Sequence, residues 1–96
     1  TCQNMTNQDL VLNIAVNMSR LGRYSLQNQY ARVSQFLEDT QKHLDQLEDF
    51  SPRFRPTYDR FKKDFLYLKS HPPDSSDWSE TAYTWAAILT HRARFA

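Results

Sequence analysis

The chain has 96 residues, 40% of them hydrophobic and 14% aromatic, with one glycine and four prolines. This length and composition fit a single helical domain over residues 1–96 and exclude a disordered or loop-rich chain. A formal net charge of +1 excludes a strong global attraction to nucleic acid or to anionic lipid.

The cysteine content and the hydropathy of the chain indicate the cellular compartment in which we expect the protein. The only cysteine is Cys2, so an intramolecular disulfide and a disulfide-stapled secreted scaffold are not expected. No apolar run approaches the roughly 18 residues of a membrane span, and no signal-peptide core is visible. We therefore expect a cytoplasmic protein without a membrane partner.

The first predicted helix covers about residues 7–21. Residues 1–5 carry no pattern and are expected to fray. Thr6 and Asp9 have the spacing of a capping box, and Gly22 is the residue type that commonly ends a helix. The core-facing side chains of this helix recur at spacings of three and four: Val11, Ile14, Met18 and Leu21.

The second predicted helix, about residues 26–49, is the element around which we expect the domain to be built. Ser25 is its expected N-cap. Five carboxylates and Lys42 on its outer face give a net charge of −4. Its apolar side chains, with one polar exception, follow a heptad spacing: Leu26, Tyr30, Val33, Leu37, Thr40, Leu44 and Leu47.

The third predicted helix, about residues 56–70, repeats this spacing with bulky aromatic residues and begins at Pro56. Six cationic and two acidic side chains between Arg53 and Lys69 give this segment a net charge of +4. A hairpin of the second and third helices would place the basic segment beside the acidic one. Each surface ion pair would contribute only about 0.2–1 kcal/mol.

The fourth predicted helix, about residues 77–94, follows the Ser-His-Pro-Pro-Asp-Ser-Ser loop. Large Trp78 and Trp85 alternate with small Ala82 along its apolar stripe, which favours close approach to a neighbouring helix. Four helices with short connections predict an all-α, antiparallel, up-down-up-down four-helix bundle. We expect Leu37→Ala or Phe61→Ala to cost about 2–5 kcal/mol.

The sequence offers no set of residues for catalysis, a cofactor or a metal. Helical di-metal sites use Glu-x-x-His pairs, and the chain has none. Asp39 and His43 are one turn apart, but two ligands do not close a site. A single glycine excludes a Gly-rich phosphate loop. We therefore predict a protein that is not an enzyme and binds no cofactor.

The first functional hypothesis is a protein-interaction or regulatory module that self-associates as a homodimer. Leu12 and Val16 lie opposite the apolar seam of the first helix, and Ala15 beside them would let a second helix approach. The alternative is that this helix is buried on both sides, by neighbouring helices or by the N-terminal segment with Met5 as a plug.

The second functional hypothesis is nucleic-acid binding by the basic face of the third helix. The cationic side chains of this face would form a row that ends at Tyr67, whose ring could stack on a base. Neutralisation of this face by the acidic second helix is the competing explanation. The residues predicted to contact nucleic acid or an acidic partner are Arg60, Lys62, Lys63, Tyr67 and Lys69.

Overall fold

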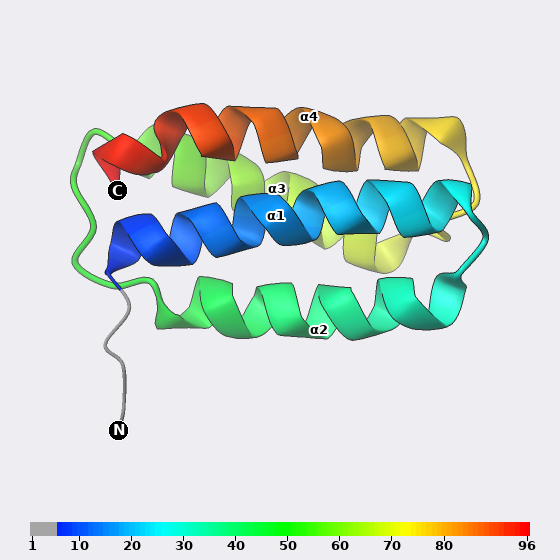
Figure 1. Ribbon diagram of the computed structural model, residues 1–96. Coiled ribbons are helices and arrows are strands. Elements are labelled where there is room, and N and C mark those ends of the chain that lie inside the picture. Colours follow the sequence, from blue (N-terminus) through cyan, green and yellow to red (C-terminus); the bar gives the residue numbers. More distant parts are fainter. Residues whose placement is uncertain (1–5) are drawn as a thin grey trace, which may run out of the picture.

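The computed structural model describes residues 6–96, and every regular element in that range is helical (Figure 1). The helices are α1 (Asn7–Leu26), α2 (Tyr30–Gln46), α3 (Arg55–Ser70) and α4 (Ser76–Arg92), and a 3₁₀ turn η1 (Ala93–Phe95) follows α4. The predicted all-helical class with four helices is confirmed. The expectation that residues 1–5 fray lies outside the described residues.

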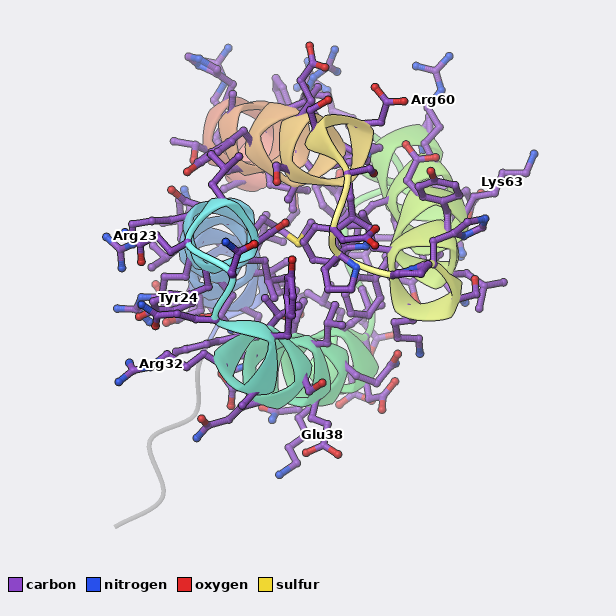
Figure 2. All side chains as sticks on the ribbon, turned by 90° about the vertical axis from the view of Figure 1, so that its right-hand side faces the viewer. Arg23, Tyr24, Arg32, Glu38, Arg60 and Lys63 are labelled. Carbon is purple, nitrogen blue, oxygen red and sulfur yellow. The ribbon has the colours of Figure 1, made fainter. Side chains whose placement is uncertain are left out.

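The four helices surround one core, as the view down the bundle in Figure 2 shows. The α1–α2 turn and the α3–α4 loop lie at one end of the molecule, and the 47–54 segment lies at the other (Figure 1). Hydrogen bonds join segments at each end: Ser25 Oγ donates to Pro73 O at 2.6 Å, and Asn7 Nδ2 donates to Glu48 O at 2.7 Å. Within residues 6–96 no helix combines the length and apolar character needed to cross a membrane.

The central helix is α1, not the predicted segment 26–47. Nine residues of α1 are buried, against three of α2, because α1 packs against both α2 and α4. Leu26 and Tyr30, which begin the predicted heptad, are 61% and 40% exposed. Leu37 is only partly buried. The heptad is therefore correct at Val33, Thr40, Leu44 and Leu47, and wrong at its first two positions.

The boundary between the first two helices also differs from the prediction. Gly22 lies inside α1 and is buried, because the Tyr83 ring of α4 occupies the space where a side chain would stand. Ser25 is a buried α1 residue rather than a cap. The chain turns at Asn28, whose positive φ of 59° places it in the left-handed region that Asn tolerates better than most residues.

The other ends lie close to their predicted positions. The Thr6–Asp9 capping box is present, and α3 begins one residue before Pro56. Ser75 caps α4 by accepting a hydrogen bond from Trp78 N. The helix α2 ends at Gln46, three residues early, and Asp49 has a φ of 55° in the following connection.

The acidic α2 and the basic α3 meet at a hollow lined by Glu38, Lys42 and Lys69, but within residues 6–96 no ion pair joins the two helices. The one close contact in that range between a carboxylate and a basic side chain joins Asp39 to His43 within α2, at 3.7 Å. The side chain that bridges α2 and α3 is Lys69, which donates to the neutral Gln41 Oε1 at 2.6 Å. Hydrophobic burial, rather than charge pairing, therefore holds these two helices in place.

Candidate functional site

A groove of about 690 Å³ lies between α3 and α4. These helices are kept apart by large side chains, since the Phe61 and Trp85 rings meet edge to face at 5.3 Å. By contrast, α1 and α4 approach closely at Gly22, whose missing side chain leaves room for Tyr83. The large rings at the α3–α4 contact therefore favour an open groove there, whereas the glycine allows close contact between α1 and α4.

The walls of the groove are predominantly basic. Its charged side chains are Arg60, Lys63 and Arg92, against one carboxylate, and the His91 ring lies beside them. In Figure 2, Arg60 and Lys63 extend outward from α3 into solvent. The apolar part of the lining comes from Trp85 and Ile88. The full lining is Thr57, Arg60, Lys63, Asp64, Thr84, Trp85, Ile88, His91 and Arg92.

The single carboxylate in this groove, Asp64, has a structural partner. Its Oδ2 accepts a hydrogen bond of 2.7 Å from Trp85 Nε1, which ties α3 to α4. A second hollow of about 300 Å³ shares Asp64 and Trp85 and adds Asp77 and Glu80. The α3–α4 seam therefore changes from basic to acidic along its length.

The residues predicted on the third helix do not form one row. Arg60 and Lys63 line the α3–α4 groove. Lys69 instead lines a hollow on the α2 side, and Lys62 Nζ lies 5.2 Å from the centre of the Tyr58 ring. Tyr67 is 40% exposed, and its ring stacks on His71 at 4.0 Å.

The predicted self-association residues of α1 are also separated. Leu12 and Val16 are 39% and 49% exposed, whereas Ala15 is 3% exposed and belongs to the core. In this structure Ala15 therefore offers no surface to a second helix. The proposed plug, Met5, lies outside the described residues.

Histidine and carboxylate side chains form no metal cluster in the described part of the chain. His43 Nδ1 lies 2.8 Å from the backbone oxygen of Asp39, whose carboxylate also accepts from Asn17 Nδ2 at 2.9 Å. This contact orients the histidine ring toward its own helix. The geometry fits a local structural contact better than a ligand pair.

Sequence reasoning missed two groups of residues. His91 and Arg92 belong to no site predicted from the sequence, yet they supply the second wall of the basic groove. The second group is an arginine–aromatic surface on α1 and α2. Its sequence signal is a stretch, from residue 10 to residue 37, that contains three arginines and no acid.

Comparison of the chain with protein-family models, with curated proteins and with solved structures finds no match.

Proposed function

We propose that the chain is a non-enzymatic protein-interaction module, built as an antiparallel, up-down-up-down four-helix bundle, whose α3–α4 groove binds a partner segment. The observation that carries the proposal is the charge change along this seam, from Arg60, Lys63 and Arg92 to Asp77 and Glu80. A segment with acidic residues at one end, basic residues at the other and apolar residues between them would complement it.

The proposal includes two further assignments. The module self-associates through Leu12 and Val16, which are exposed on neighbouring turns of α1. A cytoplasmic location belongs to the same proposal, and its support is that the sequence has a single cysteine and therefore no disulfide framework.

Fluorescence anisotropy with synthetic peptides tests the groove. One labelled peptide carries a glutamate block, a leucine pair and a lysine block, and a second has the same composition with alternating charges. We expect the block peptide to bind more tightly. Arg60→Glu combined with Arg92→Glu should weaken its binding about tenfold, equivalent to about 1.4 kcal/mol.

Lys62→Glu combined with Lys69→Glu is the matched control, because it makes the same charge change at two residues outside the groove lining. It should leave the affinity for the block peptide nearly unchanged. Equal binding of the two peptides, or equal losses from the control and the groove variant, would show that only general charge is being measured.

Nucleic-acid binding through α3 is the second candidate function. The observation that favours it is that, within residues 6–96, no α3 cation forms an ion pair with an acid of α2. The residues proposed for this contact are Arg60, Lys62, Lys63, Tyr67 and Lys69. A gel shift at low salt, about 50 mM, tests this function because screening weakens such binding at higher salt.

A further inference from the structure

An arginine–aromatic surface spans α1 and α2 near the turn that joins them. It consists of Arg20, Arg23 and Tyr24 from α1 and of Arg32 and Phe36 from α2. The Tyr24 and Phe36 rings stack with their centroids 5.6 Å apart. In Figure 2, Arg23, Tyr24 and Arg32 extend outward on the same side of the molecule.

Each arginine of this surface lies near an aromatic ring. The guanidinium carbon of Arg20 is 5.5 Å from the centre of the Phe36 ring. Those of Arg23 and Arg32 are 5.1 and 5.5 Å from the centre of the Tyr24 ring. A ring contact restrains a guanidinium while leaving N–H groups at its edge able to donate to an oxyanion.

The arginines lack anionic partners within the described part of the chain. None forms an ion pair there, and the sequence has no acid between Asp9 and Glu38. Asp39, one turn beyond Phe36, is bound by Asn17 and lies near His43. Three guanidinium groups therefore lie at these two rings, while the carboxylates of Glu38 and Asp39 line a hollow with Phe36 at the edge of this surface.

The neighbouring arginines also affect the pKa of the Tyr24 hydroxyl. Arg23 Nη2 lies 3.5 Å from the Tyr24 oxygen. Hydrogen bonding to Arg23, and then to Arg32, lowers the pKa of Tyr24 below its ordinary value, since a nearby cation stabilises the phenolate. The same field would stabilise any anion that approaches the two guanidinium groups.

We propose that the surface formed by Arg20, Arg23 and Arg32, with Tyr24 and Phe36, binds the phosphate backbone of a nucleic acid. Planar guanidinium groups match phosphate oxygens with paired N–H donors. Three such groups spread over two helices suit a ligand with repeated phosphates better than a single small anion. The turn between the helices adds the neutral amides of Gln27, Asn28 and Gln29, which do not repel a phosphate chain.

This surface lies on α1 and α2, so the inference is independent of the proposed α3–α4 groove. The test uses the full chain and a labelled oligothymidylate of about 20 nucleotides, longer than the usual single-strand site. A labelled duplex of the same length and labelled polyglutamate are measured beside it. Fluorescence anisotropy at several salt concentrations gives the affinity and its salt dependence.

Arg23→Glu combined with Arg32→Glu should weaken nucleic-acid binding at least tenfold. It should also make the dependence of log K on log salt concentration less steep. For the single strand the slope should fall by about 1.4, at about 0.7 for each of the two lost phosphate contacts. The matched control is Arg53→Glu combined with Arg94→Glu, which makes the same charge change at two arginines that lie over the Phe95 ring instead. A further variant, Arg60→Glu with Lys63→Glu, measures the competing α3 surface. If the reversed variant fails to give a helical spectrum, Arg23→Gln with Arg32→Gln replaces it.

Binding of either nucleic acid that is lost in the α1–α2 variant and kept in the Arg53 and Arg94 control would support the inference. It would be overturned by no binding to the parent at low salt, by equal losses in the α1–α2 variant and the control, or by polyglutamate binding as tightly as the oligonucleotides. Loss in the α3 variant alone would also overturn it, and would favour the second candidate function instead. The peptide measurements on the groove remain a separate test.

Discussion

The ring of Tyr83 lies where a side chain on Gly22 would stand, since an added Cβ would come within 2.9 Å of two ring atoms. Gly22→Ala should gain up to about 1 kcal/mol of helix propensity and lose most of this gain, because the Tyr83 ring, which is 39% exposed, must move aside. We therefore expect little or no increase in the free energy of unfolding, measured by urea denaturation.

In a Tyr83→Ala background, the ring that obstructs a side chain at position 22 is absent. There, Gly22→Ala should raise the free energy of unfolding by about 1 kcal/mol, since only the helix propensity changes. A Gly22→Ala effect of the same size and sign in both backgrounds would contradict the close packing described for these two residues.

The hydrogen bond from Trp85 to Asp64 gives a second prediction. Trp85 is 5% exposed, and its indole N–H donates to Asp64 at 2.7 Å. Asp64→Ala should cost about 1–3 kcal/mol because it leaves this buried donor without an acceptor. Asp64→Asn, which keeps an acceptor oxygen, should cost less. Thermal unfolding of the two variants makes the comparison, and equal losses would argue against the bond.

The helical pattern of the sequence predicted the number and approximate positions of the helices, because burial on one face imposes a period near 3.6. It failed at Gly22, where local propensity favours a helix end but packing against Tyr83 keeps the residue inside α1. Tertiary contact overrode propensity there. The central position of α1 was missed for a related reason, since seam spacing alone does not say how many neighbours a helix has.

The candidate site was predicted only in part. Arg60 and Lys63 were identified from α3 alone, but the opposite wall at Arg92 depends on how α3 and α4 pack. The arginine–aromatic surface requires Tyr24 and Phe36, twelve positions apart, to meet across the α1–α2 turn. Spacing within one helix cannot reveal a contact between two helices.

Two substitutions test how deeply Phe61 and Leu37 are buried. Phe61 is 2% exposed, so Phe61→Ala should lower the free energy of unfolding by about 3–5 kcal/mol. Leu37 is only partly buried and borders the hollow on the α2–α3 side. Leu37→Ala should therefore cost less than about 2 kcal/mol, below the range for a fully buried leucine. If both variants lost a similar free energy of unfolding in urea denaturation, Leu37 would be a core residue after all.

Self-association through α1 is tested by changing Leu12 to Glu and Val16 to Lys together. Both side chains are exposed in the single chain, so the variant should keep its helical circular dichroism spectrum. If a dimer forms through them, sedimentation velocity should detect a parent dimer and a variant monomer. A parent that stays monomeric at high concentration would refute the dimer, and an unfolded variant would mean that this face is buried.

The pH response of Tyr24 tests the local field of the arginines. Hydrogen bonds to Arg23 and then Arg32 lower the pKa of Tyr24, so Arg23→Gln should raise this pKa toward its ordinary value. A pKa lower in the folded than in the unfolded state stabilises the fold only once the phenol ionises. This contribution is complete above the unfolded pKa, falls away as the pH drops through the folded pKa, and is absent at neutral pH.

Ultraviolet absorbance of the phenolate, followed through an alkaline titration, measures the pKa, and the spectrum lost in Tyr24→Phe identifies which phenol is involved. Lys62→Gln is a suitable control, because it removes one positive charge that lies beside Tyr58 instead. The Tyr24 titration should move to higher pH in Arg23→Gln and stay in place in Lys62→Gln. An unchanged titration in Arg23→Gln would mean that the guanidinium does not act on the phenol, and would remove one support for an anion-binding surface.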